Sequence, residues 1–227
     1  MQDKIEKVTY GNGDRYTGHL RNSLKHGQGT YRYASGDVYN GEFHNDKMHG
    51  YGIYKSSNGD LYAGNFHKDK RSGKGKLKYV NQDVYEGLFK RNRREGEGVI
   101  KYNDGRVYRG SFLNDKCNGN GVLTYPSGDV LEGEFRDGYV NGFGILRFSN
   151  RNTCKGQFQD DKMFGSGVLE YCNGDIYEGE LQEGKKHGTG VLKYAGGDIY
   201  CGQFVDDRRE GRGVLRFTND DFYDGCW

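Results

Sequence analysis

The sequence predicts an all-β protein built as a continuous antiparallel meander of hairpins. Three observations predict it: a fixed repeat, alternation with period two inside each repeat, and glycine held at fixed positions. The chain has 227 residues, with 39 glycines and 1 proline. Glycine costs about 1 kcal/mol relative to alanine inside a helix, which disfavours a helical bundle. An aromatic content of 14% disfavours a disordered chain, since disordered chains are poor in aromatics.

The repeat has a period of 23 residues, and we number its columns from a tyrosine taken as column 0. Column 2 is glycine in all ten repeats, and column 4 is large and apolar in all ten, from Leu20 to Trp227. The residues of column 0 are Tyr16, Tyr39, Tyr62, Tyr85, Tyr108, Leu131, Cys154, Tyr177, Tyr200 and Tyr223.

Two further glycine columns follow in each repeat. Columns 11 and 13 are glycine in all nine complete repeats, and column 17 is aromatic in eight of the nine, with Ser56 as the exception. With the turn glycines, 35 of the 39 glycines are in register, so glycine is placed and not merely abundant. We expect Gly119→Val to damage folding more than Gly138→Val, because Gly138 lies outside these columns.

Each repeat is predicted to be one hairpin, taken here in chain order. The first strand carries Tyr-x-Gly-x-Phe, six loop residues follow, and the second strand carries Gly-x-Gly-x-Leu-x-Tyr. Turns such as Ser35-Gly36-Asp37 supply the positive φ angles that tight connections need and lead to the next repeat. With period two, the tyrosine, glycine and phenylalanine columns share one face of the strands.

The glycine columns are predicted to form a groove in which the tyrosine and phenylalanine rings lie. Glycine weakens a strand unless something packs closely against it, and aromatic rings are the obvious occupants. Such an apolar strip suits a peptide or an amphipathic helix of a partner protein. The candidate groove residues are Tyr39, Phe43, Tyr62, Phe66, Tyr85, Phe89, Tyr108, Phe112, Phe135, Tyr177, Tyr200 and Phe204.

Charge is distributed unevenly along the chain. Residues 65–110 hold 13 Lys and Arg against 6 Asp and Glu, whereas residues 127–227 hold 12 against 18. Two successive loops, within residues 67–94, bring basic side chains to one edge: Lys68, Lys70, Arg71, Lys90, Arg91, Arg93 and Arg94. The patch fits an acidic protein tail or anionic lipid head groups. Solvated loops are the plain alternative, and nucleic acid is the weakest, because the isoelectric point is only about 8.1.

No arrangement of residues predicts catalysis, a cofactor or a metal. The Gly-x-Gly pairs recur in strand context and open no helix, unlike nucleotide-binding loops. His26, His49 and His187 stand in a column that elsewhere holds other residue types, so a structural role is expected. Five cysteines without a CxxC motif suggest reduced thiols. With neither a signal peptide nor an apolar run of about 20 residues, we expect a soluble cytoplasmic protein that is not an enzyme.

The sequence stops in the middle of a repeat, after Phe222, Tyr223 and Trp227. An open sheet edge exposes backbone donors and acceptors and invites pairing. Either the sequence continues in a longer protein, or this C-terminal edge pairs with a second copy or another partner.

The unit Asp-x-Tyr-x-Gly-x-Phe, six residues, Gly-x-Gly-x-x-x-Tyr resembles the MORN (membrane occupation and recognition nexus) repeat, and its His-Gly stands at His26-Gly27, His49-Gly50 and His187-Gly188. The resemblance implies an elongated, twisted single-layer β-sheet of about ten hairpins in one array over residues 1–227. Residues 1–15 would form a partial repeat or edge strand, 16–222 nine full repeats, and 223–227 a half-repeat. In MORN-containing enzymes the catalytic domain is a separate segment, which this sequence lacks.

The resemblance implies a non-enzymatic scaffold or adaptor in a cytoskeletal or ciliary (flagellar) assembly, able in some members to dimerise tail to tail. The alternatives are a phosphoinositide-binding membrane adaptor that uses the basic loops, or the MORN segment of a larger protein.

Overall fold

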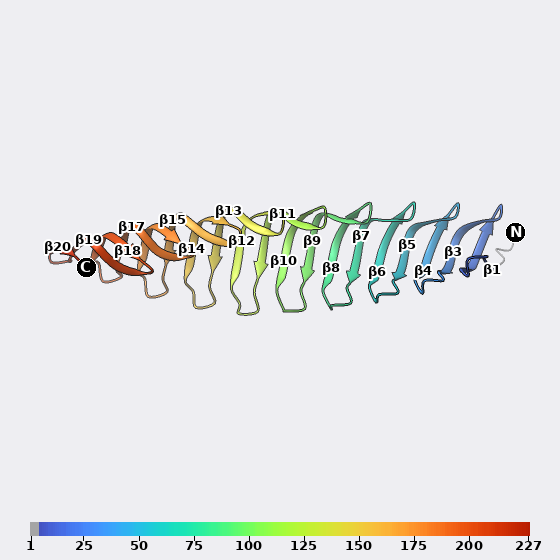
Figure 1. Cartoon of the computed structure of the whole chain (residues 1–227), viewed down its shortest axis with the longest axis horizontal. Coiled ribbons are helices and arrows are strands. Elements are labelled where there is room, and N and C mark those ends of the chain that lie inside the picture. The colour runs from blue at the N-terminus through green and yellow to red at the C-terminus, as the bar shows by residue number, and fades with distance from the viewer. Residues whose placement is uncertain (1–4) are drawn as a thin grey trace. The chain divides into compact units, whose positions relative to one another are not determined.

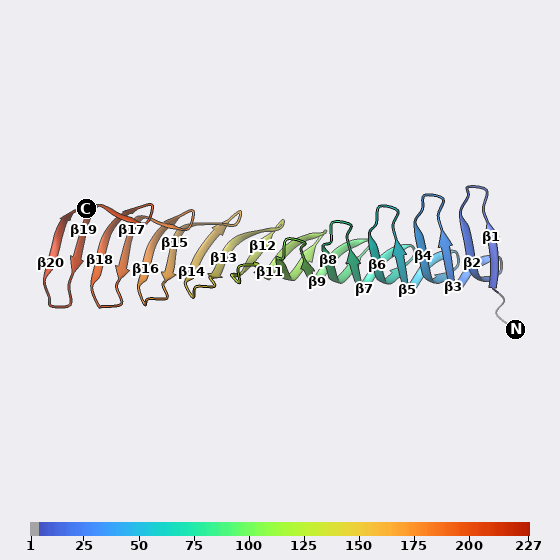
Figure 2. The same cartoon turned by 90° about the horizontal axis from the view of Figure 1, so that it is seen from below.

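The computed structural model describes residues 5–227 and consists of strands and turns, with no helix among them. Residues 1–4 of the expected N-terminal segment 1–15 lie outside the described residues. The chain divides into two compact units, one ending at Lys116 and the other spanning Cys117–Trp227. Within each unit the strands follow one another in chain order (Figures 1 and 2).

The strands of the first unit are β1 (Ile5–Thr9), β2 (Arg15–Arg21), β3 (Leu24–Arg32), β4 (Val38–His44), β5 (Lys47–Lys55), β6 (Leu61–His67), β7 (Lys70–Lys78), β8 (Val84–Lys90), β9 (Arg93–Lys101) and β10 (Val107–Leu113). The second unit contains β11 (Lys116–Thr124), whose first residue ends the first unit, β12 (Val130–Arg136), β13 (Tyr139–Arg147), β14 (Thr153–Gln159), β15 (Lys162–Glu170), β16 (Ile176–Gln182), β17 (Lys185–Lys193), β18 (Ile199–Val205), β19 (Arg208–Arg216) and β20 (Phe222–Cys226).

Within each unit, each strand pairs antiparallel with the next along the chain, which confirms the predicted meander. In β4 and β5, Tyr39 lies opposite Tyr54 and Gly41 opposite Gly52. The same register recurs between β16 and β17, where Gly179 lies opposite Gly190. The 23-residue period therefore places the glycines of columns 2 and 13 directly across from each other in one hairpin.

The predicted six-residue loop inside each repeat is wrong. The connection between β4 and β5 is a turn of two residues, Asn45 and Asp46, with φ of 48° and 67°. Two successive positive φ angles are typical of the type I′ turn, whose twist matches that of a hairpin. The following residues, Lys47 to His49, already belong to β5.

The glycines of column 11 serve the backbone and not the aromatic rings, which corrects their expected role. All nine have positive φ, between 57° at Gly188 and 114° at Gly142. The register shifts between Gly41 and Glu42, opposite the segment that contains Gly50, so this column marks a β-bulge. A bulge with glycine in the left-handed region bends its strand and increases the local twist.

Gly138, although outside the glycine columns, is also constrained by its backbone, and the expected ranking of Gly119→Val and Gly138→Val stays a prediction. Gly138 is the second residue of a two-residue turn and has φ of 100°, whereas Gly119 has φ of 79°. A methyl group at Gly138 would meet no atom within 4 Å, yet the backbone conformation itself disfavours any side chain. Open space around a glycine therefore does not make it replaceable.

The core of each repeat is the column-0 tyrosine ring, packed over the paired glycines. Tyr39 is fully buried, and its ring meets Phe43 of the same repeat and Phe66 of the next edge to face, with centroids 5.1 and 5.0 Å away. Methyl groups at Gly41 and Gly52 would lie 2.8 and 2.6 Å from Cζ of Tyr39, which confirms why both columns are glycine.

The hydroxyl group at the buried end of this ring fastens it to the bulge. Tyr39 donates to the carbonyl oxygen of Glu42 at 2.8 Å, and Tyr62 donates to that of Asn65 at 2.9 Å. Burial raises the pKa of Tyr62 to about 12, so the phenol keeps the proton that it donates.

Two repeats of the second unit lack the tyrosine, and the glycine pair in the first of them is less crowded. Leu131 and Cys154 occupy column 0, and Val140 and Met163 fill the adjoining space: a methyl group at Gly133 would lie 3.2 Å from Val140. At Gly144 a methyl group would lie 3.0 Å from the Phe158 ring, farther than its counterpart at Gly52 lies from Tyr39.

These contacts predict that Gly52→Ala destabilises the protein far more than Gly144→Ala. Neither glycine has positive φ, so the comparison isolates the packing of the added methyl group. We expect Gly52→Ala to cost about 1–3 kcal/mol in unfolding free energy, the usual range for overpacking, and Gly144→Ala to cost clearly less. Urea denaturation followed by circular dichroism measures both, and equal losses would contradict this account of the glycine columns.

Candidate functional groove

Two rows of turns border the aromatic face, and each is tied together by hydrogen bonds between successive repeats. In the row of five-residue turns, which we call the turn-glycine rim, Oδ1 of Asp37 accepts from the backbone N–H of Ser57 at 2.6 Å. The equivalent bonds have donors Ala34, Val80, Asn103, Ser149, Cys172, Ala195 and Thr218, at 2.7–3.1 Å.

The second row consists of the two-residue turns, and its part in the first unit is called the basic rim. Turns of this row exchange two hydrogen bonds with the preceding repeat. Met48 donates its N–H to Oδ1 of Asp69 at 2.8 Å, and Asp69 donates its N–H to the carbonyl oxygen of Met48 at 3.1 Å. Each rim is thus fixed by side-chain oxygens that accept from the backbone of the next repeat or of the previous one.

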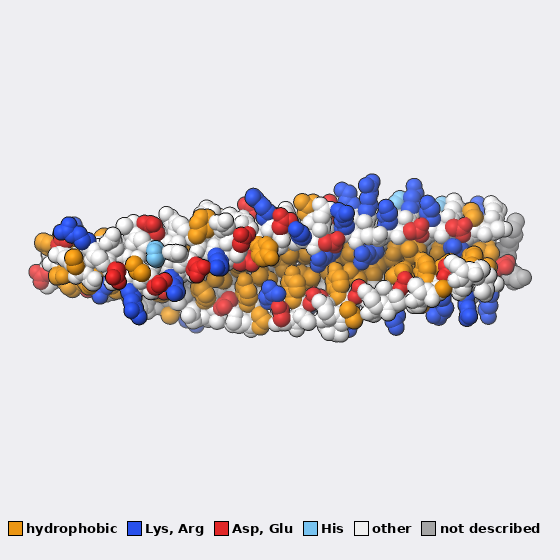
Figure 3. Space-filling view, viewed as in Figure 1, with side chains coloured by type: hydrophobic (Ala, Val, Ile, Leu, Met, Phe, Trp, Pro, Cys, Tyr) orange, Lys and Arg blue, Asp and Glu red, His pale blue; other side chains and the backbone are white. Residues whose placement is uncertain are grey.

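Between the rims of the first unit lies an apolar groove. Figure 3 shows hydrophobic side chains in a band along these strands, with polar and charged side chains on both borders. The twelve ring residues predicted to line a groove are at most 5% exposed. Eight of them form the buried floor of the groove in the first unit, whereas Phe135, Tyr177, Tyr200 and Phe204 are buried in the second unit. Their role in binding stays a proposal, and a ligand would first contact the residues above them.

Sequence reasoning missed that the column-17 rings lie over this floor. Tyr33 is partly buried, and its ring centroid lies 4.6 Å from that of Tyr31 and 6.1 Å from that of Tyr54. The pKa of Tyr33 is raised mainly by burial, and the carboxylate of Asp69, on the other rim, raises it further. The signal was present in the sequence, since column 17 is aromatic in every complete repeat but one.

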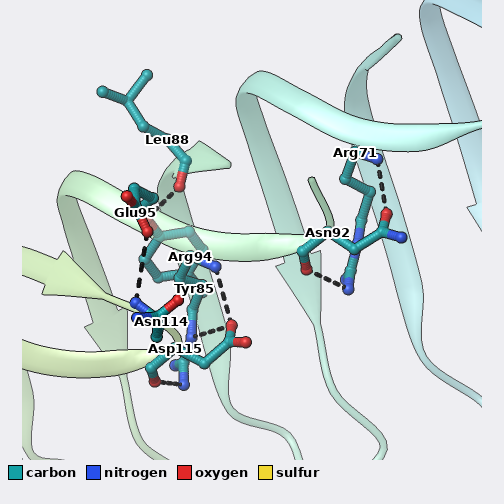
Figure 4. Close-up of polar contacts among 8 residues, drawn as sticks. All are labelled: Arg71, Tyr85, Leu88, Asn92, Arg94, Glu95, Asn114 and Asp115. Atoms are coloured by element: carbon teal, nitrogen blue, oxygen red, sulfur yellow. Dashed lines mark hydrogen bonds and ion pairs between the residues drawn. The ribbon is translucent and has the colours of Figure 1, made fainter. Parts of the chain in front are cut away.

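The seven predicted basic residues do not form a single patch. Arg71 and Arg94 turn into the groove: the guanidinium carbon of Arg71 lies 5.6 Å from the centroid of Tyr62 and 5.3 Å from that of Phe89. In Figure 4, Arg71 bonds to Asn92 and Arg94 bonds to Asp115, so both cations are held within the fold.

The other five predicted residues are exposed on the basic rim. Lys68 and Arg91 are turn residues, and Lys70, Lys90 and Arg93 sit at adjoining strand ends. Of these, Lys90 lies 3.8 Å from Glu95, and Arg93 donates to Oδ1 of Asn114 at 2.8 Å.

Imidazole rings form a second feature that the sequence analysis missed. His44 lies between His26 and His49, with ring centroids 4.9 and 5.6 Å away, and His49 lies 5.0 Å from His67. Column 10 of one repeat lies beside column 5 of the next, because Gly27 pairs with Phe43 across β3 and β4, a register that only the structure provides. Across the described part of the chain, no three His, Cys, Asp or Glu side chains are grouped so that they could hold a metal ion.

The three residues predicted at the C-terminal edge differ in how far they are exposed to solvent. Phe222 and Tyr223 are 70% and 46% exposed. Trp227 instead completes the last repeat, with its ring 5.1 Å from that of Tyr200. Its backbone N–H donates to the carbonyl oxygen of Gly211 at 2.9 Å, and the guanidinium carbon of Arg209 lies 3.8 Å from its ring centroid. A dimer through this edge stays a prediction.

A model of the MORN repeat family matches nine consecutive segments, residues 16–38, 39–61, 62–84, 85–105, 108–130, 132–153, 154–176, 177–199 and 200–222. These segments cover most of the sequence, and the chain belongs to the MORN repeat family. No relative was found among curated protein sequences. Between residues 5 and 227, no helix combines the length and the apolar character needed to cross a membrane.

A solved structure shares the fold at low sequence identity. The wild-type TCP10 domain of Danio rerio CPAP, in complex with a peptide of Danio rerio STIL, is 14% identical with a TM-score of 0.50, and the match covers 100% of this chain and 97% of that one. A mutant of the same domain is 13% identical with a TM-score of 0.47, over 98% of this chain and 99% of that one.

The turn-glycine rim predicts a stability that depends on acid. The N–H of Ser57, followed by the hydroxyl of Tyr54, holds the pKa of Asp37 below its usual value. A carboxylate with a lowered pKa stabilises the fold above the unfolded pKa of about 3.9, and this contribution is lost as pH falls through the lower folded value. Asp37→Asn should therefore lower Tm at pH 7 by roughly 2–4 °C. The difference in Tm between this variant and wild type should become smaller as the pH falls towards 2.5.

The matched control is Asn152→Asp, because Asn152 is the natural asparagine of this column and accepts from Cys172 at 2.9 Å. It should raise Tm at pH 7 and leave it unchanged at pH 2.5, as measured by thermal melts across the pH range. If the difference in Tm between Asp37→Asn and wild type stayed constant with pH, the stabilising role of the Asp37 charge would be contradicted.

Proposed function

We propose that this protein is a non-enzymatic scaffold that binds an acidic, amphipathic segment of a partner protein along the groove of the first unit. The observation that carries the proposal is the pairing of an apolar floor with a basic rim. An apolar stripe of the partner would lie on the band seen in Figure 3, and its acidic side chains would face the basic rim.

Charge complementarity determines the partner's chemistry. Residues 65–110, which span β7, β8 and β9, carry a net charge of +7, from 13 basic against 6 acidic residues. Opposite charges along a docking surface speed association and reject partners of like charge. The side chains that would meet the partner are the exposed Lys68, Lys70, Lys90, Arg91 and Arg93.

The family and the fold support binding as the role. MORN repeats are in general binding or adaptor modules, which favours a scaffold over an enzyme. The TCP10 domain of CPAP, which shares the fold, was solved with a peptide of another protein. We infer a cytoskeletal or ciliary setting from the family resemblance, and pairing through Phe222 and Tyr223 of the C-terminal edge is part of the same proposal.

A second candidate is an adaptor for phosphoinositide-containing membranes. The exposed cations of the basic rim favour it, because clustered Lys and Arg each contribute about 1 kcal/mol of attraction to an anionic membrane surface. This function would use the rim alone and leave the groove unoccupied.

The test uses the full chain as bait in an affinity pull-down, with captured proteins identified by mass spectrometry and their affinities measured by calorimetry. We expect Lys90→Glu, Arg91→Glu and Arg93→Glu together to weaken partner binding at least about tenfold, which corresponds to about 1.4 kcal/mol. The matched control replaces Lys55, Lys78 and Lys101 with Glu. These three lysines are exposed at the ends of β5, β7 and β9 that lie away from the basic rim, so this variant should bind like wild type.

Flotation with vesicles containing phosphatidylinositol bisphosphate separates the two candidates. Protein capture that needs the basic rim, with no flotation at low salt, supports the scaffold. Salt-sensitive flotation that is lost in the triple variant, with no captured protein, would overturn the scaffold in favour of the membrane adaptor.

A further inference from the structure

The third repeat leaves a gap in the row of column-17 rings. The backbone at Ser56 makes the same hydrogen bonds as its counterparts. The N–H of Ser56 donates to the carbonyl oxygen of Asp60 at 2.9 Å, and the carbonyl oxygen of Ser56 accepts from the N–H of Gly59 at 3.0 Å. Tyr33 makes the same two bonds in its own turn, at 2.9 and 3.0 Å. The side chain at position 56 therefore leaves the backbone in the same direction as that of Tyr33. Serine is too short to extend across the groove as a tyrosine does.

A pocket of about 380 Å³ opens beside Ser56, at the small end of the range for ligand sites. Its walls combine aromatic and aliphatic groups with five polar side chains, those of Ser56, Asp60, Asp69, Arg71 and Asn92. The rings of Tyr33 and Tyr54 and the side chain of Leu77 line it together with these polar groups. The pocket is the place that a column-17 ring would take.

A repeat of the second unit shows how such a ring is held. The hydroxyl oxygen of Tyr171, in column 17, accepts from Nζ of Lys186 at 3.2 Å, and the same nitrogen lies 5.2 Å from the ring centroid. Lys186 follows Tyr171 by the same number of residues as Arg71 follows Ser56. Arg71 is partly buried in the pocket wall, over the rings of Tyr62 and Phe89. The cation that holds the ring is present at the gap, and only the ring is missing.

We propose that this pocket receives a tyrosine side chain of the partner segment, which rests on the scaffold function proposed above. The phenol ring would pack against Tyr33 and Leu77, and its oxygen would accept a hydrogen bond from Arg71. Carboxylates of Asp60 and Asp69 line the same pocket and disfavour a phosphorylated or otherwise anionic ring. The occupant is therefore a neutral tyrosine of the partner, whose ring takes the place of the missing column-17 ring.

A pocket in the second unit differs in this respect. It has a volume of about 440 Å³ and lies beside Cys154, where a column-0 ring is absent, but both of its column-17 positions, Phe148 and Tyr171, already carry rings. Met163 occupies part of that space, with its sulfur 3.1 Å from Sγ of Cys154. The gap at Ser56, in contrast, stays open as a pocket.

The test uses 4-methylphenol, which is the side chain of tyrosine, and methyl NMR of the full chain. In wild type we expect saturable shifts of the Leu77 and Met48 methyl signals. Ser56→Tyr should abolish these shifts and raise Tm, because the chain then fills the pocket with its own ring. Ser57→Tyr, which adds the same residue one position further on at an exposed site, should bind 4-methylphenol like wild type.

Should Ser56→Tyr fail to fold, Ser56→Phe serves instead, since Phe148 and Phe217 occupy column 17 in other repeats. The absence of saturable shifts in wild type, or their persistence in a folded filled variant, would overturn the proposal.

The captured partner distinguishes this proposal from the scaffold function. We expect Ser56→Tyr to weaken partner binding at least about tenfold. Full affinity in Ser56→Tyr, together with loss of affinity in the basic-rim variant, would leave the scaffold standing and remove the partner tyrosine. Binding of 4-methylphenol at the pocket without any captured partner would overturn the scaffold function and leave only a phenol-binding pocket.

Discussion

The packing of one tyrosine ring over two facing glycines is the constraint on which the rest of this structure depends. The ring of Tyr39 covers Gly41 and Gly52, meets Phe43 and Phe66 edge to face, and is fastened by its hydroxyl to the backbone. Edge-to-face aromatic pairs contribute about 0.5–1.5 kcal/mol beyond the area that they bury. Since each ring contacts the next repeat, the same packing that stabilises one hairpin joins it to its neighbour. The row of rings thereby forms the hydrophobic core of a structure that consists of strands alone.

The bulge and the rims follow from this packing. A glycine in the left-handed region, such as Gly50, bends the second strand so that the tyrosine hydroxyl reaches a carbonyl group beside it. Carboxylates at both ends of the strands then bond to backbone N–H groups of adjoining repeats, as Asp37 does with Ser57 and Asp69 with Met48. These bonds hold the rims at fixed positions, so the groove is formed before any ligand arrives, which lowers the cost of binding.

Function is expected where the repeats differ, because what all repeats share is needed for folding. Ser56 omits a ring and opens a pocket, Arg71 and Arg94 bring cations into the groove, and the turns at Lys68 and Arg91 carry charge to one rim. None of these residues belongs to the invariant columns. A repeat protein can vary them with little loss of stability, since the glycine and tyrosine columns maintain the fold.

The sequence by itself determined the period, the meander and the pairing of tyrosine with glycine, because a strand alternates with period two and only glycine fits beneath a ring. Only the tertiary structure decided that the twelve predicted groove rings are buried, that the column-11 glycines shape a bulge, and that Arg71 and Arg94 point inward while their neighbours face solvent. The register between the two strands of a hairpin also shifts by two residues at the bulge, from Gly41 opposite Gly52 to Glu42 opposite His49, and this shift sets which residues face each other near the turn. A period read from a sequence does not contain that change.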